Sequence, residues 1–203
     1  MTMARMRQQA VNGKVHGLFL LAVLNLLVPV LPACGPPAFT DIRRDIGSRG
    51  HYIEGVPFVR QEEHACGPAA LAGVYAYWKR PADLDRLTDR VVLHKLGGTL
   101  PMDMERAAKE DGFRTATAHG DRRLLFDSLK RDVPVICLLD LGFGLYQRPH
   151  YVTVVGFDDG NGLFIVHDGV TQDRTMTYEQ FEKAWSRAGR WLLVITPVSS
   201  SPR

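Results

Sequence analysis

The chain has 203 residues, of which 45% are hydrophobic and 23% are charged. This composition is that of an ordinary globular protein, so it excludes collagen-like and intrinsically disordered classes and favours one folded domain. The formal net charge of +3 belongs to residues 1–33, which contain basic but no acidic residues. The remainder is formally neutral and has no block of basic residues, so we expect no nucleic-acid partner.

Residues 1–33 have the layout of a secretory signal peptide. Arg5, Arg7 and Lys14 precede an apolar run at residues 18–30. This run is shorter than the roughly 20 apolar residues that a helix needs to cross a bilayer, which favours export over a permanent membrane span.

Cys34 follows this signal and is predicted to carry a lipid. Residues 31–35 read Leu-Pro-Ala-Cys-Gly and resemble the lipobox of bacterial lipoproteins, in which the cysteine is lipidated and becomes the mature N-terminus. The alternative is simple cleavage after Ala33, with Cys34 as an ordinary thiol. We expect an exported, membrane-anchored lipoprotein, and Gly35 favours the outer membrane with the domain facing the periplasm.

Residues 34–51 are predicted to be a tether, and residues 52–203 the globular domain. The tether begins with a Gly-Pro-Pro segment and continues with polar residues, a composition typical of linkers. Residues 56–59 are expected to be extended, because the residue before Pro57 avoids the helical region.

A helix is predicted over residues 66–79, with Pro68 in the first turn, where its missing N–H costs little. Four apolar side chains share one face of this helix: Leu71, Val74, Tyr75 and Trp78. Small residues, including Gly73, would let the helix pack closely against a sheet.

The rest of the domain is predicted to contain more helices and then a sheet. Helices are expected at residues 82–92, 101–111 (capped by Thr99), 121–131 and 178–187. Strands are expected at residues 134–141, 151–157, 162–167 and 191–196. Helices followed by a mainly antiparallel sheet make an α+β fold.

Cys66 is the candidate nucleophile because it opens the first of these helices. The partial positive charge at a helix N-terminus favours a thiolate and is predicted to lower the thiol pKa, and nearby backbone N–H groups can hold an oxyanion. Gln61, five residues upstream, offers a side-chain amide as a second oxyanion donor. The alternative is that Cys66 is only a small residue at a helix start.

His150 is the candidate base and Asp168 its orienting partner. The midpoint of the two is residue 159, inside the turn at residues 158–162, so a hairpin would place them opposite each other, with Cβ atoms about 4.5–5.5 Å apart. A slip in register would favour His167 or Asp173 instead.

The remaining cysteine, Cys137, lies inside an apolar run and is predicted to be an inert core residue. A disulfide between Cys66 and Cys137 is the competing interpretation and would abolish the nucleophile.

Four segments contain these candidate residues: Gln61, Cys66-Gly67-Pro68-Ala69, His150-Tyr151-Val152-x-Val154-Val155-Gly156-Phe157 and Asp168-Gly169. Over about residues 56–196 the chain resembles the papain-like peptidases related to bacteriocin-processing (double-glycine leader) peptidases, in a stand-alone lipoprotein form. The resemblance implies a papain-like α+β fold, hydrolysis of a peptide bond in a peptide or protein substrate, and no metal or organic cofactor. The sequence contains no transporter domain like that of export-linked members, which leaves secretion-coupled leader removal open.

Three other functions are compatible with parts of this pattern. A non-catalytic relative would bind peptides in the same groove without cleaving them. A cell-wall peptide amidase or acyl transferase would use the same catalytic residues on a different amide. A zinc site at Cys66, His150, Asp168 and His64 has suitable ligand types but lacks any recognised ligand spacing.

Overall fold

A computed structural model describes residues 46, 49–62 and 64–198, which belong to one compact unit, Asp41–Arg203. The predicted signal at residues 1–33 and Cys34 lie outside the described residues, as does most of the predicted tether. The first strand, β1 (Gly50–Tyr52), already pairs with the main sheet. The last two residues of the predicted tether, 50 and 51, are therefore part of the folded domain. In the described part of the chain no helix is long and apolar enough to span a membrane.

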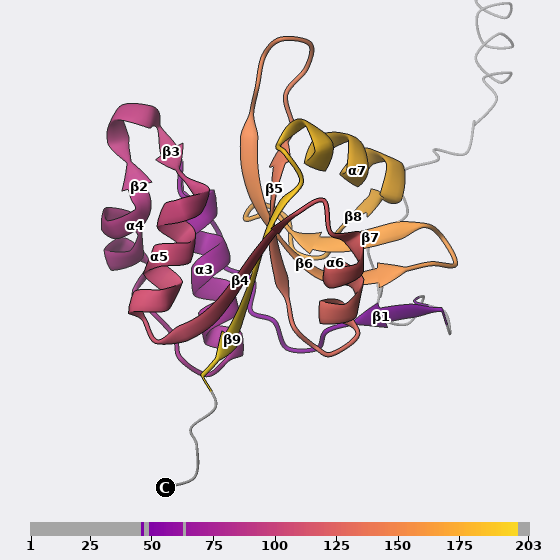
Figure 1. The fold of residues 1–203 in the computed structure, drawn as a ribbon, viewed down its shortest axis with the longest axis horizontal. Coiled ribbons are helices and arrows are strands. Elements are labelled where there is room, and N and C mark those ends of the chain that lie inside the picture. The colour runs from indigo at the N-terminus through magenta and orange to yellow at the C-terminus, as the bar shows by residue number, and fades with distance from the viewer. Residues whose placement is uncertain (1–45, 47–48, 63, 199–203) are drawn as a thin grey trace, which may run out of the picture. The chain divides into compact units, whose positions relative to one another are not determined.

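The centre of the domain is an antiparallel sheet of seven strands (Figure 1). Six of them follow the order β4-β9-β5-β6-β7-β8, and the seventh, β1, pairs with the C-terminal end of β6, beyond the part of β6 that pairs with β5. The bounds of the remaining strands are β4 Phe113–His119, β5 Val135–Asp140, β6 Pro149–Asp158, β7 Leu163–His167, β8 Arg174–Thr177 and β9 Trp191–Pro197. The predicted mainly antiparallel sheet is confirmed.

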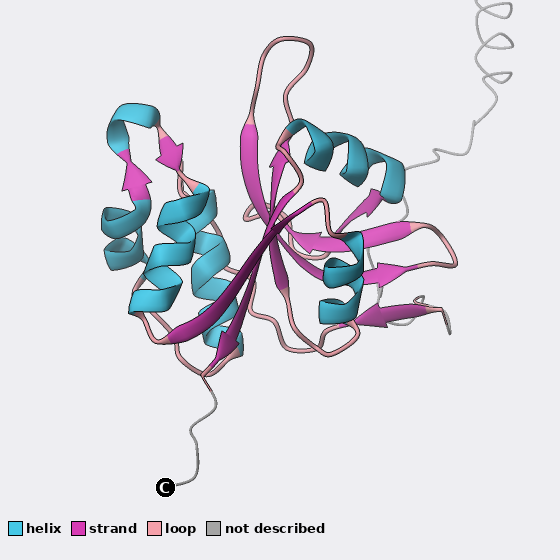
Figure 2. Ribbon diagram, viewed as in Figure 1, coloured by secondary structure: helices cyan, strands magenta, loops and turns pink. Residues whose placement is uncertain are grey.

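Two groups of helices cover the two faces of this sheet (Figure 2). The first group packs against the face that carries Ile136 and Tyr151 and consists of α3 Cys66–Tyr77, α4 Leu84–Val91 and α5 Pro101–Glu110. The second group packs against the opposite face and consists of α6 Arg122–Leu129 and α7 Tyr178–Arg187. A short hairpin, β2 Val92–Leu93 and β3 Gly98–Thr99, connects α4 to α5 through a 3-10 turn, His94–Leu96.

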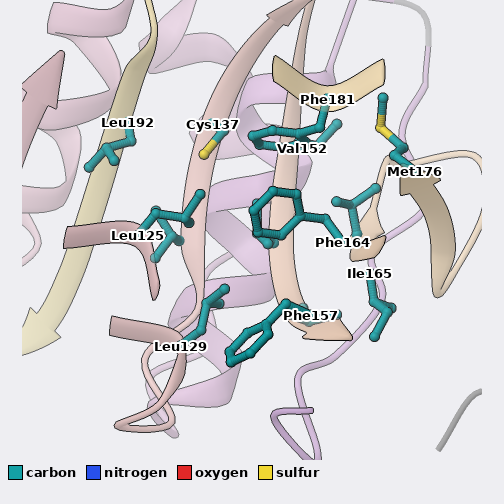
Figure 3. Close-up of a cluster of buried hydrophobic side chains, with 14 of the residues drawn as sticks. Leu125, Leu129, Cys137, Val152, Phe157, Phe164, Ile165, Met176, Phe181 and Leu192 are labelled. Atoms are coloured by element: carbon teal, nitrogen blue, oxygen red, sulfur yellow. The ribbon is translucent and has the colours of Figure 1, made fainter. Parts of the chain in front are cut away.

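Cys137 lies on β5 in the core between the sheet and the second helix group. Its side chain is fully buried among Leu125, Val152 and Leu192 in the same hydrophobic cluster (Figure 3). Both Cys66 and Cys137 are free thiols, so the competing disulfide is not formed. Burial raises the pKa of the Cys137 thiol far above its usual range, which agrees with an inert core residue.

Helix α3 has the predicted start but is not amphipathic in its packing. Nine consecutive residues from Gly67 to Tyr75 are buried, because the sheet, α4 and α5 contact the helix from different sides. A Cβ on Gly73 would lie 2.9 Å from the carbonyl oxygen of Pro57. Gly73 therefore lets helix α3 approach the extended segment at Pro57 closely, in addition to the predicted close packing against the sheet.

Helix boundaries follow local capping, and one predicted cap is wrong. Helix α7 begins as predicted, with Thr177 and Gln180 forming a reciprocal capping box. Helix α5 is preceded by Leu100 at the N-cap position without a side-chain cap, while the predicted cap Thr99 lies in β3. Pro101 in the first turn lowers the need for a cap, because it has no N–H to satisfy.

The β6–β7 hairpin does not have the predicted register. Thr153 pairs with His167 and Gly156 pairs with Ile165, so a bulge at Val155 in β6 changes the register by one residue. Continued past the end of β7, this register places Asp168 opposite Val152 and not opposite His150. The turn is centred between residues 160 and 161, because Asp158 pairs with Leu163. The extra residue of the bulge moves the register only one position back toward the predicted pairing, since without it Asp168 would lie opposite Thr153.

Candidate active site

Cys66, His150 and Gln61 line one open cleft, called the Cys66 cleft below. Its volume is about 630 Å³. Cys66 comes from the first turn of α3, His150 from the start of β6, and Gln61 from the segment before α3. Gln61 and Cys66, which are close in the sequence, thus share one solvent-accessible space with the distant His150, whereas Asp168 does not line it.

Burial dominates the electrostatics of Cys66. It raises the pKa of the thiol, and hydrogen bonds from the backbone N–H groups of Tyr151, Gly67 and Cys66 itself lower it by less. The prediction that the helix N-terminus leaves a low thiol pKa is therefore wrong for the free protein. The same N–H groups are nevertheless directed at the sulfur, where they can stabilise negative charge when it forms.

The His150 imidazole is held by a main-chain carbonyl. Its Nε2 lies 2.8 Å from the backbone oxygen of Asp168. A carbonyl oxygen only accepts hydrogen bonds, so Nε2 carries the proton and Nδ1 of the neutral ring keeps its lone pair. Burial lowers the pKa of His150, and the hydrogen bond to Asp168 opposes this shift. The neutral imidazole is thus the resting form near neutral pH.

The Asp168 carboxylate does not contact His150 by a hydrogen bond. It accepts hydrogen bonds from the backbone N–H groups of Val170 (2.9 Å) and Thr171 (2.6 Å) and pairs with the guanidinium of Arg174 at 2.9 Å. Burial raises the pKa of this carboxyl, but Arg174 and the two N–H groups outweigh it and lower the pKa overall. The carboxylate therefore builds the turn after β7, and that turn aims the carbonyl of Asp168 at His150.

Gln61 is fixed against the same turn. Its backbone N–H donates to the carbonyl oxygen of Gly169 at 2.9 Å. A Cβ on Gly169 would lie only 2.4 Å from the side-chain Oε1 of Gln61, and Gly169 has φ +78°. That oxygen is buried and has no hydrogen-bond partner among the described residues. Glycine is required at position 169 by both the backbone conformation and the close approach of Gln61.

His167 and Asp173, the alternative base and partner, form a separate pair behind Cys66. Nε2 of His167 lies 3.1 Å from Oδ1 of Asp173, with the His167 side chain only 5% exposed. His167 and Cys66 share a small cavity of about 10 Å³, which has room for about one water molecule. Of the two spaces that Cys66 lines, only the Cys66 cleft, at about 630 Å³, has room for a peptide, and His150 lines it, so His150 is the better placed histidine.

Sequence reasoning missed several residues of the Cys66 cleft. Thr99, Tyr146, Arg148 and Tyr151 all line it, and the hydroxyl of Tyr151 donates to the carbonyl oxygen of Thr99 at 3.1 Å. Arg148 stands two residues before His150, and a cation so near a candidate base is a signal that the sequence does contain.

No metal centre is built by the described residues, which contain no group of three or more His, Cys, Asp or Glu side chains placed to hold an ion. In particular, the carboxylate of Asp168 is turned toward Arg174 and two N–H groups, and so it does not join Cys66 and His150 in a ligand set.

Residues 53–192 match the Peptidase C39-like family. The chain belongs to this family. The match covers nearly all of the described domain and includes each of the candidate residues in the cleft, so membership indicates a cysteine peptidase function.

Two further comparisons agree with the family. The chain is 30% identical over 126 residues to the mesentericin transport/processing ATP-binding protein MesD of Leuconostoc mesenteroides, covering 62% of this chain and 17% of that relative. The chain therefore spans about a sixth of the curated relative it matches. It also resembles the peptidase domain of Streptococcus ComA, a bifunctional ABC transporter involved in quorum sensing, with 26% identity and a TM-score of 0.59, covering 71% of this chain and all of that domain.

A third similarity shows the fold. A double glycine motif protease from an AMS/PCAT transporter, solved in complex with its leader peptide, is 23% identical, with a TM-score of 0.57 and coverage of 74% of this chain and 96% of that one. The expected papain-like α+β fold is thus confirmed by the solved structures of C39 peptidase domains.

Proposed function

We propose that this protein hydrolyses a peptide bond in a peptide or protein substrate, with Cys66 as nucleophile and His150 as base. The observation that carries the proposal is the placement of Cys66 and His150 on one open cleft, with the imidazole fixed through Nε2. Asp168 orients the ring through its carbonyl oxygen, and Gln61 and backbone N–H groups stabilise the oxyanion.

The chemistry follows from the protonation states. Nδ1 of neutral His150 accepts the thiol proton while Sγ of Cys66 bonds to the carbonyl carbon of the substrate, whose C=O electron pair moves to oxygen. The C–N bond then breaks, the imidazolium gives its proton to the leaving nitrogen, and a thioester remains on Sγ. Water, deprotonated by His150, attacks the thioester and releases a carboxylic acid with the thiol restored. One peptide bond and one water become one carboxyl group and one amine, without any redox step.

A raised thiol pKa and a lowered imidazole pKa suit this sequence of proton transfers. The free protein holds a neutral thiol beside a neutral base, so the proton moves only when a substrate carbonyl is there to accept the new bond. The N–H groups of Tyr151 and Gly67 hydrogen-bond to the sulfur and lower the cost of the transient thiolate.

We extend the proposal to location: an exported lipoprotein that is anchored to the outer membrane through Cys34 and faces the periplasm. Support for it comes from the sequence of residues 1–35 alone. In this arrangement the domain would act on peptides outside the cytoplasm.

The test is cleavage of a combinatorial peptide library by the full-length chain, with products located by mass spectrometry. Wild type should cleave, Cys66→Ala should not, and His150→Ala should lower the rate about 10²- to 10⁴-fold. Arg131→Gln, at an exposed residue in the turn between α6 and β5, serves as the matched control and should cleave normally. Peptide binding without cleavage by wild type would favour the binding module instead, and transfer of the acyl group to an added amine in preference to water would favour the transferase.

A further inference from the structure

The Cys66 cleft has an unbalanced charge. None of the described residues that line it is acidic, while Arg148 contributes a guanidinium. A cleft of one charge sign, with partly buried walls, concentrates ligands of the opposite sign. The imbalance points to a negatively charged group on the ligand.

Arg148 is the permanent cation of this set, and its backbone is held firmly. Its N–H donates to the Asp140 carboxylate at 2.8 Å, and its carbonyl oxygen accepts from Leu141 N–H at 2.9 Å. These bonds close the neck of the β5–β6 loop, which projects beyond the sheet in Figure 1. The Asp140 carboxylate also accepts from Gly142 N–H at 2.8 Å, so the neck is fixed on both sides.

The guanidinium of Arg148, in contrast to its backbone, has no ionic partner within the described part of the chain. Two other arginines near the site are paired: Arg174 with Asp168 at 2.9 Å and Arg187 with Asp140 at 3.8 Å. Arg148 is close enough to His150 to lower the pKa of that imidazole by its charge. An unpaired cation therefore stands beside the proposed base, in the space that the substrate would occupy.

We infer that Arg148 is a specificity residue that binds a carboxylate of the substrate peptide close to the scissile bond. The inference rests on the proposed function, because it assumes that a peptide occupies the cleft. A planar guanidinium binds a carboxylate through two parallel N–H···O bonds, which gives geometric selectivity as well as attraction. The preferred substrate class is thus a peptide with an acidic group next to the cleaved bond.

The position of Arg148 limits where that acidic group can be. Arg148 and His150 are two residues apart along β6 and its approach, or about 6.6 Å at roughly 3.3 Å per residue. An extended substrate has the same rise, so the carboxylate should belong to a residue within about two positions of the scissile bond. It can be an Asp or Glu side chain, or the C-terminal carboxylate of a peptide cleaved near its end.

The first experiment uses Cys66 itself as the reporter and needs no substrate. The full-length chain is alkylated with anionic iodoacetate or with neutral iodoacetamide, and the ratio of the two rate constants at Cys66 is measured. Arg148→Gln should lower this ratio about twofold to fivefold, and Arg148→Glu should lower it further. Raising the salt to about 1 M should reduce the wild-type ratio, because screening weakens an exposed charge.

Normalisation to iodoacetamide in each variant removes any change in thiolate content that follows from a shift in the pKa of His150. Arg131→Gln is the control that removes one positive charge away from the cleft and should leave the ratio unchanged. A ratio that is the same in wild type and Arg148→Gln would overturn the inference.

The second experiment compares substrates. Peptides cleaved by wild type are resynthesised with Asp or Glu replaced by Asn or Gln near the cleavage site, each with a free or an amidated C-terminus. Wild type should prefer the acidic form about twofold to tenfold in kcat/KM, and Arg148→Gln should lose the preference. A preference abolished only by C-terminal amidation identifies the terminal carboxylate as the group bound.

Equal cleavage of acidic and amide forms by wild type would overturn the inference while leaving the proposed peptidase intact. If wild type cleaves no peptide, the proposed function fails, and the alkylation ratio still decides whether Arg148 attracts a carboxylate.

Discussion

The imidazole of His150 is bound by the backbone carbonyl of Asp168, at 2.8 Å, and not by its carboxylate. The acidic side chain instead holds the turn from which that carbonyl projects, through Val170, Thr171 and Arg174. The carboxylate of Asp168 therefore acts on the base through the turn and through its negative charge, which raises the pKa of His150, while the protonation of Nε2 depends on a backbone atom that substitution does not remove.

Asp168→Asn should consequently have a larger effect on the free energy of unfolding than on the rate of catalysis. The amide keeps an oxygen for the N–H groups of Val170 and Thr171 but loses the ion pair with Arg174, so we expect a loss of about 1–3 kcal/mol in the free energy of unfolding. The carbonyl still fixes His150, so kcat should fall by no more than about tenfold, against about 10⁴-fold where a carboxylate itself holds the histidine. Urea unfolding and kcat/KM with a cleaved peptide measure the two effects.

Arg174→Gln is the matched variant, because it removes the same ion pair and leaves Asp168 in place. Its loss of stability should resemble that of Asp168→Asn, and its activity should stay near that of wild type. A drop of several orders of magnitude in kcat for Asp168→Asn alone would show that the carboxylate orients the imidazole during turnover.

The elements that sequence reasoning predicts best are those set by local chemistry. Helix α7 has its predicted bounds because a capping box starts it, and β6 is recognised by an apolar run that is buried on both faces. Strand β4 was missed, because after Phe113 its side chains are exposed or half-buried at the edge of the sheet. An edge strand with one buried anchor has little hydrophobic periodicity to detect.

In the site, too, some features follow from the local sequence and others only from the fold. The placement of Cys66 and His150 on one cleft follows from residue types and from the order of elements, both of which the sequence contains. The contact between His150 and Asp168 depends on a bulge near Val155 and on a turn longer than a tight hairpin, neither of which leaves a distinct local signal. The sequence places Arg148 two residues before His150, but the fold is what brings the end of the β5–β6 loop to the cleft.

The pH dependence of Cys66 alkylation should show a neutral resting pair. Because the thiol pKa is raised and the imidazole pKa is lowered, the rate with iodoacetamide should rise only as the pH passes above about 8.5, the ordinary value for cysteine. Peptide cleavage needs neutral His150, so kcat/KM should fall on the acid side only below about pH 6.5, the ordinary value for histidine.

Mass spectrometry restricts this measurement to Cys66, since buried Cys137 should remain unlabelled in the folded protein. Cys137→Ala should give the same profile. An alkylation rate that is already constant from mildly acidic pH upward would mean that Cys66 and His150 form an ion pair at rest, contrary to this prediction.

His167 should contribute to stability and not to proton transfer. His167→Ala removes the hydrogen bond to Asp173 and the edge contact with Phe58, whose ring centroid lies 5.7 Å away. We expect a loss of about 1–3 kcal/mol in the free energy of unfolding, with kcat within about tenfold of wild type, while His150→Ala loses about 10²- to 10⁴-fold. The reverse order of the two kcat values would assign the base to His167.

Gly169→Ala should damage both the fold and the site, because the added Cβ meets two obstacles. At φ +78° an alanine is strained, and the methyl group would collide with the Gln61 side chain. Gly144 has φ +60° with no atom within 4 Å of a Cβ, so Gly144→Ala isolates the conformational cost of about 1–2 kcal/mol. Gly169→Ala should exceed this loss in urea unfolding and should also lower kcat/KM.

A double variant separates the two obstacles. Gln61→Ala removes the group that the new methyl would strike, so Gly169→Ala should cost less stability in that background, by an interaction energy of about 0.5–3 kcal/mol. The activity of the double variant should match that of Gln61→Ala alone, because displacement of Gln61 is how Gly169→Ala harms the reaction. Additive losses in stability and in kcat/KM would mean that Gln61 does not pack on Gly169 in solution, and its place as an oxyanion donor would lose this support.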